Sequence, residues 1–135
     1  MGNIQLPLVG VTFVSVEKSN DDELEFVAED GRTFLFYHSQ QCCEDVYIED
    51  ICGDLDDLIG VPLVEAMETS NDTGSGSPPV VEEHESVTWT FYRFTGKGTV
   101  TVRWYGSSNG YYSEEVSLLI KDKFGNVLSD MRGTR

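Results

Sequence analysis

The chain has 135 residues, 39% of them apolar, so it is long enough for one globular domain with a hydrophobic core. It carries 24 acidic and 9 basic residues, and this net charge of −15 argues against broad electrostatic binding to nucleic acid or to an anionic membrane. No stretch reaches the roughly 18 consecutive apolar residues of a membrane span. We therefore expect a single domain over residues 1–135.

The first third of the sequence predicts three antiparallel strands. Residues 9–16 alternate and are rich in β-branched side chains, which is typical of a strand. Residues 24–28 and 32–38 flank the dipeptide Asp30-Gly31, a strong signal for a hairpin turn. These segments predict a three-stranded meander.

The middle of the chain predicts shorter elements and a loop. We expect a fourth strand over 46–51 and a fifth over 63–68. Between them, Asp54 is a candidate N-cap of one short helical turn, with Asp56 and Asp57 at its positive end. Residues 71–79 consist entirely of Asn, Asp, Thr, Gly, Ser and Pro, and this composition predicts a flexible loop that extends over residues 71–85.

The last third predicts a second meander with strands over 87–94, 99–105 and 111–118. A further short strand is expected to start at Val127, within a C-terminal extension that covers residues 119–135. The fold class is therefore mainly β. We expect two antiparallel meanders packed as a small sandwich or half-open barrel, with one short helix.

The negative charge is concentrated in the middle of the chain. Between Arg32 and Arg93 lie 13 acidic residues and no Lys or Arg, so this segment carries −13 of the −15. One interpretation is a solvated surface that keeps the protein soluble. The other is a surface that binds a positive partner, such as a metal ion, a basic protein or the nucleic-acid site of a host protein.

The cysteine and histidine residues do not match a known metal or catalytic motif. The chain has three cysteines, Cys42, Cys43 and Cys52, and two of them are adjacent. An odd number with this spacing fits buried thiols in a reducing compartment better than a disulfide framework or a zinc site. Only His38 and His84 could serve as a base at neutral pH, and no nucleophile or phosphate-loop motif accompanies them. We expect no metal, no cofactor and no enzymatic activity.

The two C-terminal hairpins are rich in aromatic residues and carry two of the few cations in the chain. Aromatic faces stack on bases, and guanidinium groups bind phosphates in a bidentate manner. The alternative is that these aromatics form the core and cross-strand pairs of the sheet. The candidate ligand-binding residues are Trp89, Tyr92, Arg103, Tyr105, Asn109 and Tyr111.

Four segments of the chain form a distinctive set: Cys42-Cys-Glu44, Gly53-Asp-Leu-Asp-Asp-Leu-Ile-Gly60, Thr88-Trp-Thr-Phe-Tyr92 and Val102-Arg-Trp-Tyr-Gly-Ser-Ser-Asn-Gly-Tyr-Tyr-Ser113. In these segments the sequence resembles a family of small, mostly bacteriophage-encoded proteins without an established activity. The likeness covers roughly residues 9–118, while the loop near residue 75 and residues 119–135 look like additions. The resemblance implies a phage protein made in the cytoplasm of an infected bacterium, small enough for an accessory or counter-defence role.

The leading hypothesis is a non-enzymatic counter-defence protein that sequesters a nucleotide-derived signal. We expect a homo-oligomer that binds neither nucleic acid nor membrane, and anion capture requires that the acidic segment be turned away from the aromatic hairpins. The alternative is an acidic, nucleic-acid-mimicking inhibitor that binds a basic host protein through Asp54, Asp56 and Asp57. A virion component is a third possibility.

Overall fold

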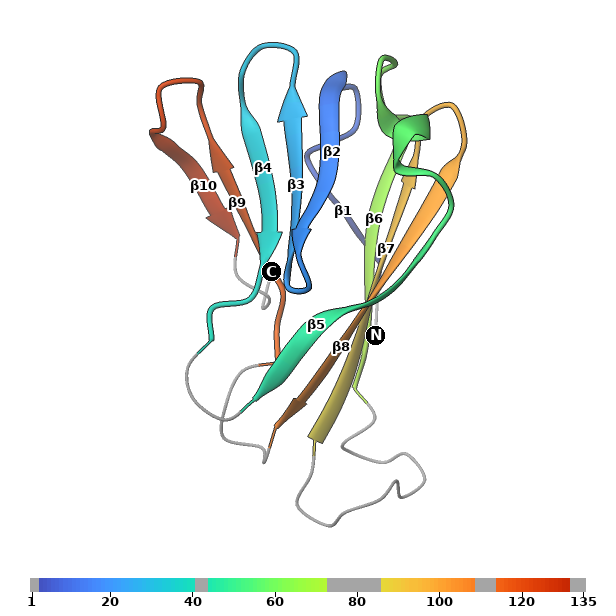
Figure 1. Ribbon diagram of the computed structural model, residues 1–135, viewed down its shortest axis with the longest axis vertical. Coiled ribbons are helices and arrows are strands. Elements are labelled where there is room, and N and C mark those ends of the chain that lie inside the picture. Colours follow the sequence, from blue (N-terminus) through green and yellow to red (C-terminus); the bar gives the residue numbers. More distant parts are fainter. Residues whose placement is uncertain (1–2, 41–43, 73–85, 109–113, 132–135) are drawn as a thin grey trace.

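The computed structural model describes residues 3–40, 44–72, 86–108 and 114–131. These residues form two five-stranded antiparallel sheets that pack face to face (Figure 1). The sole helical element among them is a 3-10 turn over Leu55–Leu58, and none of their helices is long and apolar enough to cross a membrane. The prediction of a mainly β fold is confirmed, as a two-sheet sandwich with no closed barrel.

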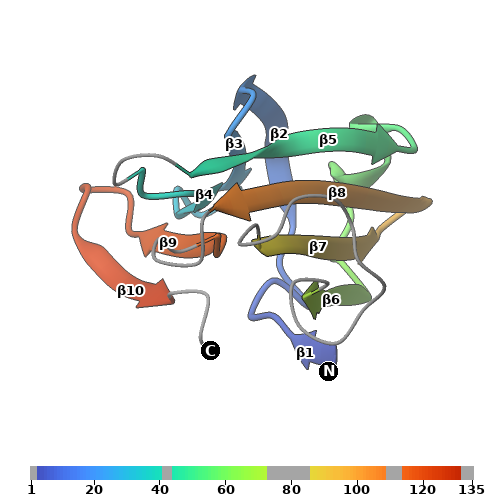
Figure 2. The same cartoon turned by 90° about the horizontal axis from the view of Figure 1, so that it is seen from below.

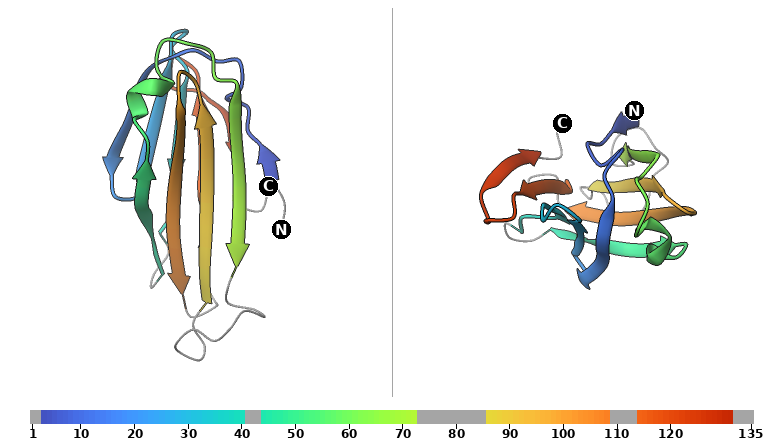
Figure 3. Two further views of the ribbon diagram at one scale, coloured as in Figure 1. Left: turned by 90° about the vertical axis from the view of Figure 1, so that its right-hand side faces the viewer. Right: turned by 90° about the horizontal axis from the view of Figure 1, so that it is seen from above.

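Both sheets combine strands that are distant from one another in the sequence. In spatial order, sheet 1 consists of β1 (Asn3–Gln5), β6 (Glu65–Asp72), β7 (Ser86–Thr95), β8 (Thr99–Ser108) and β5 (Asp45–Cys52). Sheet 2 consists of β10 (Val127–Met131), β9 (Ser117–Lys121), β4 (Thr33–Tyr37), β3 (Glu23–Ala28) and β2 (Phe13–Asn20). Seen from below, β5 and β2 lie at one side of the sandwich and β1 and β10 at the other (Figure 2). Figure 3, left, shows the outer face of sheet 1.

The local predictions for the first half of the chain agree with the structure in the order and pairing of the strands, but the strand expected over 9–16 lies at Phe13–Asn20, and β1 was not predicted. Strands β2, β3 and β4 form the expected meander, and Gly31 takes the positive φ of 95° that the β3–β4 turn requires. The Asp30 carboxylate accepts hydrogen bonds from the backbone N and the Nε of Arg32 at this turn. Asp54 caps the 3-10 turn by accepting from the backbone N of Asp56 at 2.9 Å, as its position before an acidic first turn predicted.

The prediction of a second three-stranded meander is only partly correct. Strands β7 and β8 form the expected hairpin, but the chain then crosses to sheet 2, where β9 pairs with β4. The reason is that β5 already occupies the other edge of β8, so a third strand has no room there. Crossing over also places Leu118 and Ile120 in the core. Of the expected 71–85 loop, residues 71–72 belong to β6 and residues 73–85 lie outside the described ranges.

The core lies between the sheets and is rich in phenylalanine. The rings of Phe13, Phe26 and Phe36 meet edge to face at centroid distances of 5.0 to 5.7 Å, and Phe94 of sheet 1 packs 5.0 Å from Phe26. All four side chains are fully buried. Burial of such a side chain contributes about 1.5–3 kcal/mol relative to exposure, so this cluster is a main source of stability. It also fixes which face of β7 and β8 points outward.

Candidate functional site

Three of the predicted ligand residues lie together on the outer face of sheet 1. Trp89 of β7 and Tyr105 of β8 are cross-strand neighbours, with ring centroids 5.1 Å apart. The guanidinium carbon of Arg103 lies 5.5 Å from the Trp89 ring centroid, within the range of a cation–π contact. All three side chains are half-buried, so each keeps a surface that a ligand can reach.

Two further aromatic residues lie on this surface and were not among the predicted ligand residues. Tyr47 of β5 packs 5.4 Å from Tyr105, and Phe91 lies directly opposite Arg103 in the β7–β8 register. The alternation of β5 does place Tyr47 away from its apolar face, but nothing in the sequence shows that β5 pairs with β8. We call the surface formed by Tyr47, Trp89, Phe91, Arg103 and Tyr105 the aromatic face.

Tyr92 does not belong to the aromatic face, which corrects the prediction. It lies on the inner side of β7, is 0% exposed, and packs 4.7 Å from Phe36 of sheet 2. Successive residues of a strand point to opposite faces, so Tyr92 cannot share a surface with its neighbours Phe91 and Arg93. Asn109 and Tyr111 fall outside the described residues.

The acidic segment is not turned away from the aromatic face, which is a second correction. Because β5 pairs with β8, Glu49 lies beside Arg103, and Arg103 Nε donates to Glu49 Oε1 at 2.7 Å. A terminal nitrogen of the same guanidinium also contacts Glu49, and Asp50 lies 4.0 Å away. The charge of Arg103 is therefore already balanced by carboxylates of the acidic middle segment.

An open hollow of about 430 Å³ adjoins the aromatic face. At its rim, Arg93 Nε lies 3.2 Å from Glu65 Oε1, and the Thr95 hydroxyl donates to the same oxygen at 2.9 Å. The lining therefore combines one cation, one anion, hydroxyl groups and apolar surface. Its residues are Glu65, Met67, Thr69, Phe91, Arg93 and Thr101.

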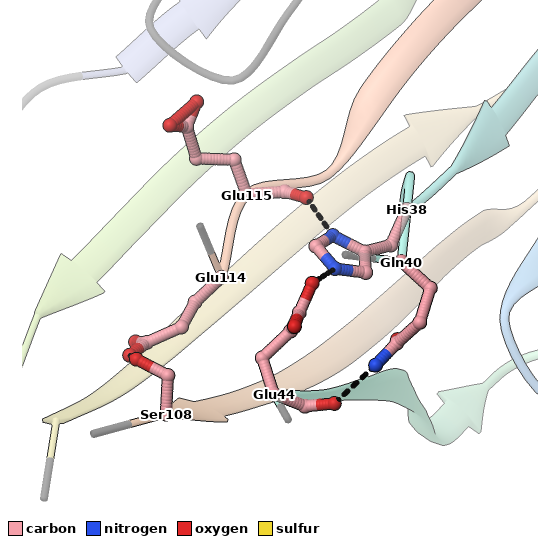
Figure 4. A network of polar contacts seen from close by, with 6 residues as sticks. All are labelled: His38, Gln40, Glu44, Ser108, Glu114 and Glu115. Atoms are coloured by element: carbon pink, nitrogen blue, oxygen red, sulfur yellow. Dashed lines mark hydrogen bonds and ion pairs between the residues drawn. The ribbon is translucent and has the colours of Figure 1, made fainter. Parts of the chain in front are cut away.

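A second group of polar residues lies buried where the chain passes between the sheets (Figure 4). His38 Nδ1 donates to the backbone oxygen of Glu115 at 2.8 Å, since a carbonyl oxygen can only accept. His38 Nε2 lies 2.8 Å from Glu44 Oε2, and one proton is held between them. Whichever atom carries this proton, the pair has no net charge, and this neutrality lowers the cost of burying it.

Glu114 is the other buried carboxylate of this region. Its two oxygens accept hydrogen bonds from the hydroxyls of Thr88 and Ser108 (Figure 4 shows the second contact). Its main chain passes so close to β8 that a Cβ at Gly106 would lie 2.9 Å from the Glu114 oxygen. The glycine of the Trp-Tyr-Gly-Ser segment is thus required by the crossing chain.

The side chains of His38 and Glu44 are 2% and 0% exposed, so neither is presented to a substrate.

The three aspartates of the acidic hypothesis have different environments. Asp54 and Asp56 are exposed, whereas Asp57 is half-buried. The backbone oxygen of Asp57 accepts from Lys97 N at 2.7 Å, and its side chain closes over Gly98 in the β7–β8 turn. Asp57 therefore has a structural role in holding the 3-10 turn against sheet 1.

The candidate metal ligands form no site within the described ranges. Cys52 is exposed and free, while Cys42 and Cys43 lie outside the described residues. No group of three or more His, Cys, Asp or Glu side chains in the described part of the chain is arranged to hold a metal ion.

Comparison with known proteins gives one match. A family described as a domain of unknown function (DUF7448) matches residues 6–118. The chain belongs to this family. No curated protein and no solved structure matches it. The match includes both the aromatic face and the buried His38–Glu44 pair, and it ends before β10.

Proposed function

We propose that the protein is a non-enzymatic binding protein that captures a nucleotide-derived small molecule on its aromatic face. The observation that carries the proposal is the row of exposed Tyr47 and half-buried Tyr105 and Trp89, with the Arg103 guanidinium beside it. Stacking of a base on an aromatic side chain contributes about 1–3 kcal/mol. The row spans three neighbouring strands. Its rings are inclined by 50° and 65° to one another, so a planar base stacks on the face of one ring and meets the next ring at an angle.

In this proposal Arg103 binds the phosphate, which must displace Glu49. The two side chains are 41% and 36% exposed. A salt bridge at this exposure contributes about 0–1 kcal/mol, so exchanging the carboxylate for a doubly charged phosphate is energetically feasible. The net charge of −15 opposes this exchange at long range, and it favours a small ligand with few phosphates over a nucleic acid.

The biological role follows from the bacteriophage setting that the sequence resemblance implies. A phage protein that binds a nucleotide signal without turning it over would lower the free concentration of that signal in the infected cell. This makes counter-defence the role that we propose, in the bacterial cytoplasm. The expected homo-oligomer stays a prediction.

The test is a binding screen with the purified chain. Isothermal titration against cyclic nucleotides and ADP-ribose derivatives is expected to give at least one ligand, whose affinity falls about 5-fold to 150-fold in Trp89→Ala. Phe124→Ala, which removes an aromatic side chain that is 78% exposed on the β9–β10 turn, is the matched control and keeps full affinity. Glu49→Gln frees Arg103 and is expected to tighten binding. No heat and no thermal shift with any compound would exclude the proposal.

A second candidate is the acidic inhibitor of a basic host protein. It is favoured by the exposed carboxylates of Asp54 and Asp56 and by Asp45 and Asp50 on the edge strand β5. It predicts binding that weakens with salt and is lost in Asp54→Asn/Asp56→Asn but kept in Trp89→Ala. The ligand-capture proposal predicts the reverse for these two variants.

A further inference from the structure

We propose that the hollow beside the aromatic face binds a vicinal diol, such as the 2′,3′-hydroxyls of a ribose. This inference rests on the proposed function and assigns a second part of the same ligand. It concerns the pair formed by Arg93 and Glu65. This pair was not predicted from the sequence, and it has no role in the stacking of a base on the aromatic face.

The hollow lies at the right place for the sugar of a stacked nucleotide. Trp89, Phe91 and Arg93 are alternate residues of β7, so their side chains follow one another at about 6.8 Å intervals on one face. Arg103 lies opposite Phe91 across the β7–β8 ladder. A base on Trp89 therefore places its sugar over Phe91 and next to Arg93, with Arg103 at the side where a 5′-phosphate is carried.

Glu65 and Arg93 have hydrogen-bonding capacity that the described residues leave unused. Both contacts to the Glu65 carboxylate fall on Oε1, from Arg93 Nε and from the Thr95 hydroxyl. Within the described part of the chain, Glu65 Oε2 and the two terminal nitrogens of Arg93 have no partner. Arg103 differs, because both its Nε and a terminal nitrogen contact Glu49.

The chemistry of this unused capacity favours a neutral diol. A phosphate at Arg93 would face the Glu65 carboxylate, which the Thr95 hydroxyl holds in place, and a cation at Glu65 would face the Arg93 guanidinium. Glu49 differs, because among the described residues it contacts Arg103 alone and can move aside for a phosphate. Two adjacent hydroxyls can donate to Glu65 Oε2 and accept from Arg93, which satisfies both side chains without a charge clash. A carboxylate that accepts from ribose hydroxyls is also the usual device of dinucleotide-binding folds.

The remaining lining suits the apolar side of a sugar ring. Phe91 and Met67 supply apolar surface against which ring C–H groups can pack. Thr69 and Thr101 add hydroxyls at the edge of the hollow. Its volume of about 430 Å³ lies within the range of small-molecule sites and exceeds what a pentose alone needs.

The test compares ligands that differ only in the diol. Adenosine and guanosine 5′-monophosphates, each in the ribo and the 2′,3′-dideoxy form, are titrated into the full chain labelled with ¹³C in its methyl groups and with ¹⁵N, and followed by NMR. We expect the ribo form to bind about 10-fold more tightly and to shift the methyl signals of Met67 and Thr101. Glu65→Gln is expected to abolish this ratio, because the amide nitrogen that replaces one carboxylate oxygen cannot accept from the diol, while the remaining oxygen still accepts from Thr95.

Glu49→Gln is the matched control, because it neutralises the other carboxylate paired with an arginine on this face. It changes the affinity for both forms equally and keeps their ratio. Equal affinity for the two forms, or a ratio that survives Glu65→Gln, overturns the diol site but not the capture of a base. Methyl shifts in the hollow without a shift of the Trp89 indole support the hollow and overturn the stacking platform. No binding of any of the four compounds overturns the diol site, whereas the capture proposal is tested separately by the screen of cyclic nucleotides and ADP-ribose derivatives.

Discussion

Phe91 and Phe94 lie three residues apart on β7, yet they belong to different environments. Phe94 is fully buried and packs 5.0 Å from Phe26 of sheet 2. Phe91 is half-buried on the outer face, beside Arg103 and the hollow. The hairpin β7–β8 therefore has one face that holds the sandwich together and one face that is available to a ligand.

This contrast shows how one strand can use similar residues for core packing on one face and for an accessible surface on the other. Hydrophobic burial stabilises the inner face in proportion to the area removed from water, so its residues are fixed by packing. The outer aromatics gain only partial burial from their cross-strand neighbours. The outer face can therefore vary at low cost in stability, and the strongest effects of its substitutions are expected on binding.

The first prediction tests the contrast directly and has the largest expected effect. Phe94→Ala is expected to lower the free energy of unfolding by about 3–5 kcal/mol, because it leaves a cavity in the core. Phe91→Ala is expected to cost about 1 kcal/mol, since its ring is only half-buried. Urea unfolding followed by circular dichroism measures both. Similar losses for the two variants would show that the outer face is part of the core.

The second prediction concerns the buried polar pair formed by His38 and Glu44. Glu44→Gln is expected to cost about 3 kcal/mol, because it breaks a buried pair and leaves His38 with a poorer partner. The double variant His38→Leu/Glu44→Met is expected to lose less than Glu44→Gln alone, since apolar side chains of similar size need no partner. A loss below about 0.5 kcal/mol for Glu44→Gln, on the scale of surface substitutions, would contradict a structural role for the pair.

The third prediction concerns an exposed turn and has the smallest effect. The backbone N–H of Arg32 donates to Asp30 and is the main reason that the pKa of this carboxyl is lowered. The stabilising contribution of Asp30 is therefore complete above the unfolded-state pKa of about 3.9 and is lost as the pH falls through the lower folded-state pKa. NMR titration of the carboxyl carbon measures it. Arg32→Ala keeps the backbone donor and is expected to remove only part of the shift.

Much of the fold could be predicted because it depends on local signals. The Asp30-Gly31 turn and the Asp54 cap each follow from a few neighbouring residues, and alternation located most strands. The partners of the strands depend on contacts distant in sequence. Two features distant in sequence go with the border of β8: the pairing of β5 with its edge, and the burial of Leu118 and Ile120 in the core after the chain crosses to sheet 2. No local pattern encodes either of them.

The candidate site was also predicted only as far as local patterns reach. Trp89, Arg103 and Tyr105 share a face because alternation along β7 and β8 requires it. The same alternation excludes Tyr92, although its residue type made it attractive as a ligand residue. Tyr47, Glu49 and the buried Glu44 come from the segment around β5. Their roles could not be found before the pairing of β5 with β8 was known.

The crossing of the chain into β9 has a practical consequence for where the protein can be shortened. The family match ends at residue 118, in the second position of β9. A chain cut at that boundary loses Leu119, Ile120 and Lys121, which pair with Leu35, Phe34 and Thr33 of β4. It would also uncover one edge of a sheet whose inner face carries most of the phenylalanine cluster. Expression trials and hybrid proteins therefore need an end point beyond Lys121, even where only the shared family segment is of interest.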